Sequence, residues 1–180
     1  MKLKNIILIC YILFMSVFAF SQNAFIENKG QLAEKSGKIR NDVHFKLEQP
    51  GVNAYFKPDG IIYHFHQSTK KTKENYSAED LINFKKGDMN AISKMVHFFR
   101  LDLNLMNANK NAEYASIGIQ NQKYNYYLPH CPKGITNVSS CEEIIYKNIY
   151  PNIDIHYYFV EGKLKYEFIV YPGGDINNIK

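Results

Sequence analysis

The stretch from Lys147 to Asp175, KNIYPNIDIHYYFVEGKLKYEFIVYPGGD, contains two segments in which apolar and polar residues alternate. Between them lies Glu161-Gly162-Lys163, whose glycine can adopt the positive φ of a tight turn. Successive side chains of a strand point to opposite faces, so each segment predicts a strand with one apolar face. Together they predict a β-hairpin whose apolar face lies on a core. That face comprises Ile153, Ile155, Tyr157, Phe159, Leu164, Tyr166, Phe168 and Val170.

The opposite face of this hairpin is polar. It carries Asp154 and His156 on the first strand and Lys165 and Glu167 on the second. Cross-strand pairing among such residues contributes about 0.2–1 kcal/mol per pair. The second strand is expected to end at Pro172-Gly173-Gly174, because proline cannot donate to a ladder and glycine favours turns.

Upstream of the hairpin, the same alternation recurs in short segments separated by turn residues. Val43–Leu47, Val52–Phe56 and Ile61–Phe65 are separated by Pro50-Gly51 and Pro58-Asp59-Gly60, and they predict a three-stranded meander. Strands are also expected in Met95–Met106, Glu113–Ile119 and Lys123–Leu128, whereas Pro129–Cys141 is expected to be a loop.

The polar segment Gln67–Lys94 interrupts the strand pattern. Within it, Ser77 precedes an acidic first turn and the apolar residues of one helical turn, and Gly87 follows. This order predicts one short helix in an exposed loop. The predicted fold class is therefore all-β, an antiparallel β-sandwich-like domain with one short helix in a polar loop.

Composition agrees with a single globular domain and excludes a disordered chain. The 180 residues are 46% hydrophobic and 22% charged, with 14 Tyr, 12 Phe and no Trp. The net charge is +5, and it falls to +3 once Lys2 and Lys4 are removed with a leader. The remaining lysines are scattered, so nothing indicates the basic face that nucleic-acid binding needs.

The N-terminus has the pattern of a secretory signal peptide. Lys2 and Lys4 precede an apolar run from Ile6 to Phe20, and polar residues follow. The run is short for a membrane helix of about 20 residues. We therefore predict a signal peptide at residues 1–22, a single β-rich domain at residues 23–180, and no membrane span after cleavage. Cleavage is expected near Ala19 to Gln22.

Two cysteines, Cys131 and Cys141, lie outside the leader. An exported protein with an even number of cysteines is a candidate for a disulfide, here closing a loop of about ten residues. The alternative is a pair of reduced thiols beneath a loop. A zinc site is disfavoured because no second close pair of Cys or His completes a tetrahedral set.

No residue pattern assigns a catalytic, cofactor-binding or metal-binding site. His64 and His66 share a face of one strand and could chelate a metal, but hydrogen-bonded histidines are the simpler interpretation. The same holds for His44, His97, His130 and His156. Nucleophile-elbow, phosphate-loop and zinc-protease motifs are absent from the sequence.

Two features leave room for carbohydrate chemistry. Asp154 and Glu167 could face each other across the hairpin as a carboxylate pair. Tyr124, Tyr126 and Tyr127 could stack on sugars, although such tyrosines are more often half-buried strand residues.

Several motifs together resemble a known family. They are FIENKGQ (25–31), PDGIIY (58–63), YNYYL (124–128), GITNV (134–138), IYPNID (149–154) and LKYEFIV (164–170). Their order is similar to that of the uncharacterised N-terminal domain that precedes seven-bladed β-propeller-type (SBBP) repeats, PKD-like modules or a gliding-motility-type sorting domain.

The resemblance implies a secreted or cell-surface protein of Bacteroidetes-like bacteria and, in longer members, type IX secretion. It brings no catalytic residues and no cofactor. It also implies downstream modules as partners, so we expect that the domain is truncated at its C-terminal end. The leading hypothesis is a non-enzymatic exported module with a structural or adhesion role, contacting surface glycans or other surface proteins. The alternative is a carbohydrate-binding or glycoside-cleaving β domain.

Overall fold

The computed structural model describes residues 23–70, 76–88 and 94–180. The predicted signal peptide at residues 1–22 and parts of the polar segment, residues 71–75 and 89–93, lie outside the described residues. The strands are β1 (Phe25–Glu27), β2 (Phe45–Gln49), β3 (Val52–Lys57), β4 (Gly60–Lys70), β5 (Lys94–Asn104), β6 (Tyr114–Ile117), β7 (Tyr124–Leu128), β8 (Cys131–Val138), β9 (Ser140–Cys141), β10 (Glu143–Tyr150), β11 (Ile153–Val160) and β12 (Lys163–Val170).

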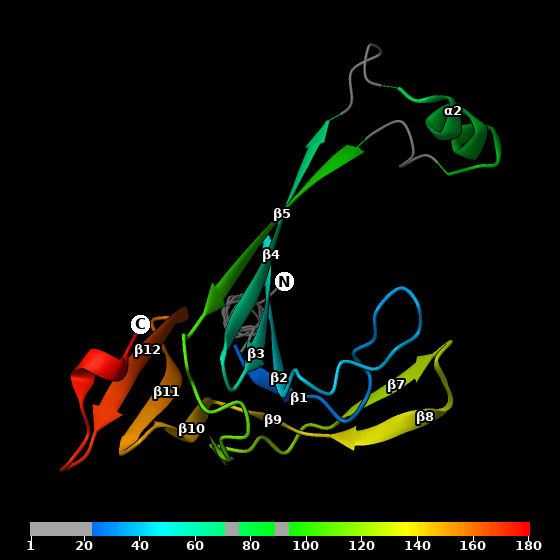
Figure 1. Ribbon diagram of the computed structural model, residues 1–180. Helices are drawn as coiled ribbons and strands as arrows, with labels where there is room; N and C mark the ends of the chain where they lie inside the picture. Colours follow the sequence, from blue (N-terminus) through cyan, green and yellow to red (C-terminus); the bar gives the residue numbers. More distant parts are fainter. Residues whose placement is uncertain (1–22, 71–75, 89–93) are drawn as a thin grey trace, which may run out of the picture.

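These strands form three antiparallel sheets (Figure 1). The first has the order β5-β4-β3-β2-β1-β9, the second β12-β11-β10-β6, and the third is the β7-β8 hairpin. The all-β, sandwich-like class predicted from the sequence is confirmed. The meander is confirmed too, because β2 pairs with β3 and β3 pairs with β4.

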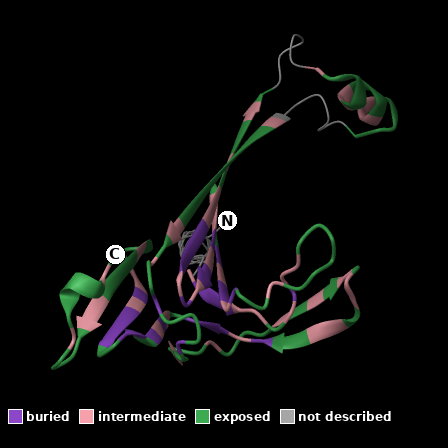
Figure 2. Ribbon diagram, viewed as in Figure 1, coloured by how far each residue is buried: buried purple, intermediate pink, exposed green. Residues whose placement is uncertain are grey.

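The first and second sheets pack face to face through aromatic side chains. The Phe56 and Tyr157 rings lie 5.1 Å apart, and those of Phe25 and Phe159 lie 4.8 Å apart. Burial is concentrated at this junction of the sheets (Figure 2). Aromatic contacts of this kind add about 0.5–1.5 kcal/mol beyond the burial of their area.

The hairpin of β11 and β12 forms as predicted. Its ladder runs from Ile153 opposite Val170 to Val160 opposite Lys163. Glu161 (φ 50°) and Gly162 (φ 76°) form the two-residue turn, whose positive φ values suit the twist of the flanking strands. The apolar face of β11 is buried as expected. On β12 that face is half covered, because β12 is the edge strand of its sheet and Tyr166 is 53% exposed.

The sandwich is joined on one side and open on the other. On the β6–β9 side, the Gln120 N–H donates to the Ser140 carbonyl over 2.9 Å. On the opposite side the edge strands are β5 and β12. There the Met106 N–H donates to the Lys180 carbonyl over 2.8 Å. A C-terminal 3-10 turn, η2 (Ile176–Asn178), precedes that contact.

The short helix predicted in the polar segment is confirmed as α2 (Ala78–Lys85). Ser77 is its N-cap: the Asp80 N–H donates to the Ser77 hydroxyl over 3.1 Å, and the Ser77 N–H donates to the Asp80 carboxylate over 2.8 Å. This capping box satisfies two of the backbone donors that a helix start leaves unpaired. The remainder was expected to be loop, but β4 continues to Lys70 and β5 begins at Lys94.

The prediction of a loop over Pro129–Cys141 is wrong, because strands β8 and β9 occupy most of it. β8 pairs with β7 through Tyr126 opposite Ile135, although Pro132 and Gly134 interrupt its alternation. A Cβ on Gly134 would lie 2.6 Å from the Tyr127 ring. The ring therefore lies against the glycine backbone across the hairpin, a contact that compensates for the missing side chain.

Candidate functional site

Phe98, the most exposed large apolar residue of the described part of the chain, lies on a two-stranded arm formed by β4 and β5. These strands pair over their whole length, from Gly60 opposite Asn104 to Lys70 opposite Lys94. The neighbouring strand β3 pairs with β4 only as far as Phe65. Beyond that point the two strands continue as a ribbon away from the sandwich, and α2 lies past its outer end (Figure 1).

One face of the arm continues the core face of the sheet into solvent. It begins with Ile61 opposite Leu103 in the body and continues with Phe65 opposite Phe99. Those two phenylalanine rings lie 6.2 Å apart, and Phe99 is 64% exposed. Leu101, between them and the body, is 47% exposed. The row of apolar residues therefore extends well beyond the part that the second sheet covers (Figure 2).

The other face of the arm mixes aromatic and charged residues. Phe98 is 78% exposed and lies opposite His66. Next to it, the Arg100 guanidinium donates two hydrogen bonds to the Asp102 carboxylate, over 2.7 and 2.8 Å. This contact holds the pKa of Asp102 below its ordinary value and raises that of Arg100. Both faces of β5 thus offer large apolar surface around one ion pair.

The sequence contains one signal that points to this surface. Phe98 and Phe99 are adjacent, so they must lie on opposite faces of a strand. A strand with aromatic residues on both faces is either buried on both sides or exposes one of them. Alternation alone does not distinguish these cases, because it carries no information on which strands outrun their neighbours.

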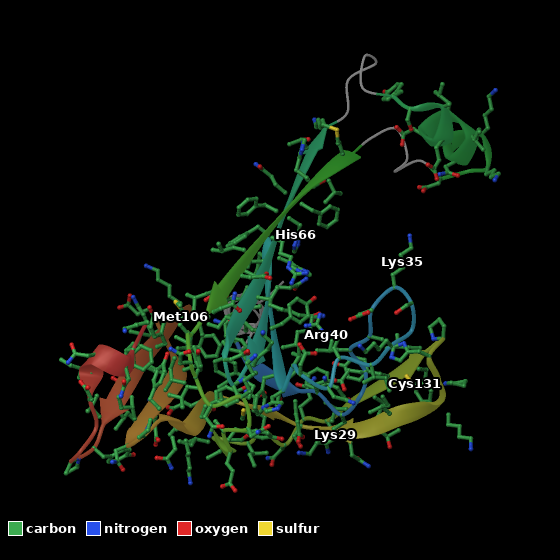
Figure 3. All side chains as sticks on the ribbon, viewed as in Figure 1. Lys29, Lys35, Arg40, His66, Met106 and Cys131 are labelled. Atoms are coloured by element: carbon green, nitrogen blue, oxygen red, sulfur yellow. The ribbon has the colours of Figure 1, made fainter. Side chains whose placement is uncertain are left out.

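The histidines do not form a metal centre. His64 packs against Tyr55, with ring centroids 5.0 Å apart. The pKa of His64 is lowered, mainly by burial and to a smaller extent by the positive charge of Arg100. His66 lies further out on the arm (Figure 3), and His97 contacts Thr69 Oγ1 at 3.2 Å. Burial lowers the pKa of His44, which lies in the body. Within the described ranges no three His, Cys, Asp or Glu side chains are grouped to hold a metal ion.

His64 and His130 do line one polar pocket, of about 260 Å³, together with Arg40 and Glu34. The pocket lies between the 30–40 loop and the outer face of the meander. The Arg40 guanidinium donates two hydrogen bonds of 2.7 Å to Asp42, and His130 Nε2 lies 3.3 Å from the Gly30 carbonyl. These polar groups already form hydrogen-bond contacts within the protein, which makes the pocket a weaker candidate for a binding site than the arm.

The loop beside this pocket is held by two residues of the FIENKGQ motif. Asn28 donates to the carbonyls of Arg40 and Val43 and accepts from the Gly30 and Leu32 N–H groups. Gln31 is buried and donates to the Glu27 carbonyl. Their side chains replace backbone partners in an irregular segment, so the motif is structural.

The predicted disulfide is not formed, since Cys131 and Cys141 are both free. Cys131 begins the eight-residue strand β8 at the outer end of the β7–β8 hairpin (Figure 3), and Cys141 lies on β9 beside Phe25. Eight extended residues span roughly 20 Å, whereas a disulfide needs Cα atoms about 4.4–6.8 Å apart. Burial raises the pKa of the Cys141 thiol to about 11, which keeps it protonated and unreactive.

Asp154 and Glu167 do not face each other as a carboxylate pair. The register places Glu167 opposite His156 and Asp154 opposite Ile169. His156 lies between two carboxylates, with Nδ1 3.0 Å from Glu167 and Nε2 2.7 Å from Glu143. Asp154 is buried and accepts from the Asn148 N–H over 2.7 Å and from the Tyr171 hydroxyl over 3.1 Å. Its oxygens serve the bend that joins β10 to β11.

We therefore expect Asp154→Ala to lower the free energy of unfolding by about 2 kcal/mol, because it leaves the Asn148 N–H without its charged acceptor. Glu167→Ala, the matched change on the exposed strand, should cost less than about 1 kcal/mol. Urea denaturation of both variants measures the difference. Equal losses would contradict the structural role assigned to Asp154.

The three tyrosines proposed for sugar stacking lie on β7 but do not form one platform. Tyr124 and Tyr126 are half-buried on one face, and Tyr127 is exposed on the other, where its ring covers Gly134. An apolar pocket of about 250 Å³, lined by residues such as Leu103, Tyr166 and Ile179, lies instead at the open side of the sandwich.

A family model described as a domain of unknown function, DUF7948, matches residues 25–180. Neither a curated protein nor a solved structure matches the chain. Among helices in the part of the chain that the structure describes, none is long and apolar enough to cross a membrane.

Proposed function

We propose that this chain, which belongs to the DUF7948 family, is a non-enzymatic binding module of an exported bacterial protein that acts at the cell surface or after secretion. The projecting arm supports this proposal most directly. A ribbon that exposes Phe98, Phe99 and Leu101 presents apolar area that is costly to leave in water. Such a surface is typical of a site that another macromolecule covers.

The shape of the arm supports the proposal as well as its polarity. The arm extends β4 and β5 past the strands that stabilise them, so its outer half gains little from the core. Isolated two-stranded ribbons are marginally stable in water. Contact with a further protein surface would supply the missing burial, and the aromatic residues would act as its anchors.

Export is the second part of the proposal. It rests on Lys2, Lys4 and the apolar run from Ile6 to Phe20. Downstream modules of a longer chain, and other surface proteins, are the partners that we propose for a structural or adhesive role. Sequencing the N-terminus of the protein recovered outside the cell tests the leader, with a start near residue 23 expected.

Binding is tested by adding the fluorescently labelled 23–180 chain to cells of the producing bacterium and measuring retention after washing. The variant Phe98→Ser/Phe99→Ser should lose most of the retained signal, about tenfold, because two anchors are removed. Ile119→Ser/Ile176→Ser is the matched control, since it removes two apolar side chains of similar exposure, 61% and 65%, that lie away from the arm. Equal retention of the arm variant and the wild type would overturn the proposal.

The carbohydrate alternative has its own readout. A glycan array and a hydrolase screen on the same preparation should give neither binding nor turnover. Turnover that disappears in both Asp154→Asn and Glu167→Gln, with folding intact, would replace the non-enzymatic proposal by a glycosidase.

A further inference from the structure

We propose that the outer edge of β5 pairs antiparallel with the same edge of a second copy of the chain, centred on Leu101. The inference rests on the proposed function of the arm as a binding surface and names one occupant for it. Among the residues that the structure describes, β5 is the first strand of its sheet and pairs with β4 alone, so one side of its backbone has no strand partner there. Such an edge is a template for another strand.

The hydrogen-bond pattern identifies which β5 residues face outward. The Leu105 N–H, just after β5, donates to the Asp59 carbonyl over 2.8 Å, toward the β4 side. Donors and acceptors alternate between the two sides of an antiparallel strand. Odd-numbered residues of β5 therefore bond with β4. The outward-facing donors and acceptors belong to even-numbered residues, including Arg100 and Asp102.

Charge then selects the register. With the twofold axis at Leu101, Arg100 lies opposite Asp102 of the second copy, and Asp102 lies opposite its Arg100. Both are outward-facing residues, so the same pairs exchange backbone hydrogen bonds. Moving the axis by one residue places Arg100 opposite Arg100, or Asp102 opposite Asp102, and like charges directly opposite are destabilising. Only a twofold axis at Leu101 places opposite charges in both of these cross-strand pairs.

The apolar face fits the same register. Leu101 lies opposite Leu101 of the second copy, and Phe99 lies opposite its Leu103. These are non-hydrogen-bonded pairs, in which side chains approach most closely. Phe99 and Leu101 are the exposed residues that the second sheet leaves uncovered. Pairing covers them while the Arg100–Asp102 pairs form on the opposite face.

β5 also carries few of the features that protect edge strands from pairing. Its sequence, KMVHFFRLDLN, contains no proline or glycine to bend or interrupt it. Its central charges are the one pair that complements itself across the proposed axis. An edge that repelled a second copy would carry charges of one sign instead.

Analytical ultracentrifugation of the 23–180 chain tests the proposal, with a monomer–dimer equilibrium expected at sub-millimolar concentration. Arg100→Asp alone and Asp102→Arg alone should each raise the dimer Kd by at least about tenfold, because each places two like charges opposite each other. Mixing these two variants should restore dimers, since both cross-strand pairs are again opposite in charge. The double variant Arg100→Asp/Asp102→Arg should dimerise alone for the same reason.

The matched control is the Lys46–Glu48 ion pair on β2, which has the same spacing of two residues and lies three strands away from β5 in the sheet. Glu48→Lys should leave the dimer Kd unchanged. Circular dichroism of each variant reports folding, and recovery on mixing cannot arise from misfolded chains. A wild-type monomer, or a dimer insensitive to these charges, as pairing through β12 would give, overturns the inference. A monomer whose arm variant still loses retention on cells leaves the proposed function intact.

Discussion

Replacing Phe25 by alanine is expected to lower the free energy of unfolding by about 3–5 kcal/mol, the range for deleting a fully buried aromatic side chain. Phe25 has no solvent exposure, and its ring lies 5.1 Å from Phe56 and 4.8 Å from Phe159. It contacts both sheets at once. Its strand, β1, has three residues and joins β2 to β9, so little local structure exists to absorb the cavity.

The matched control for this substitution is Phe98→Ala, which deletes the same atoms from a side chain that is 78% exposed. It should change the free energy of unfolding by less than about 0.5 kcal/mol in the monomer. Urea denaturation, followed by far-UV circular dichroism at low protein concentration, measures both. Similar losses in the two variants would mean that the core does not lie between the two sheets.

Replacing Gly60 by alanine should cost about 3 kcal/mol or more of unfolding free energy, from backbone strain and overpacking together. Gly60 has φ +147°, and a Cβ there would lie 2.0 Å from the Leu103 carbonyl oxygen. The obstacle is backbone, so it cannot rotate away as a side chain would. Relief requires β4 and β5 to separate at the end of their ladder that lies in the body.

Gly37→Ala provides the comparison, because that glycine also has positive φ, +87°, with nothing within 4 Å of the added carbon. Only the conformational strain remains there, about 1–2 kcal/mol. Thermal and urea unfolding of the two variants separate strain from steric conflict. If Gly60→Ala lost no more unfolding free energy than Gly37→Ala, the result would contradict the close approach of β5 to Gly60.

The features that could be predicted from the sequence are those encoded by neighbouring residues. The alternation of Ile153–Phe159 and the turn at Gly162 identify the β11–β12 hairpin, and Ser77 with Asp80 identifies the start of α2. Each depends on side chains within a few positions of one another. β8 could not be predicted in this way, because its stability comes from pairing with β7 and from the Tyr127 ring over Gly134.

The candidate sites were predicted less well than the fold, because they depend on the register of paired strands and on the direction in which the chain runs. A shift of two residues separates the predicted facing of Asp154 and Glu167 from the observed pairing of His156 with Glu167. Cys131 and Cys141 are ten positions apart, but the extended strand β8 between them holds them away from each other. A loop between these two cysteines could fold back and bring them together, whereas an extended strand keeps them far apart.

Fold class, the hairpin and its turn, and the helix start follow from local alternation and turn chemistry, which act on the backbone over a few residues. The order of strands, the projection of the β4–β5 arm, and the exposure of Phe98 and Phe99 follow from folding, through contacts between distant segments. Phe25 pairs with Cys141 across most of the chain. Such pairings gain their free energy from burial that exists only when both sheets are assembled, so no short window of residues encodes them.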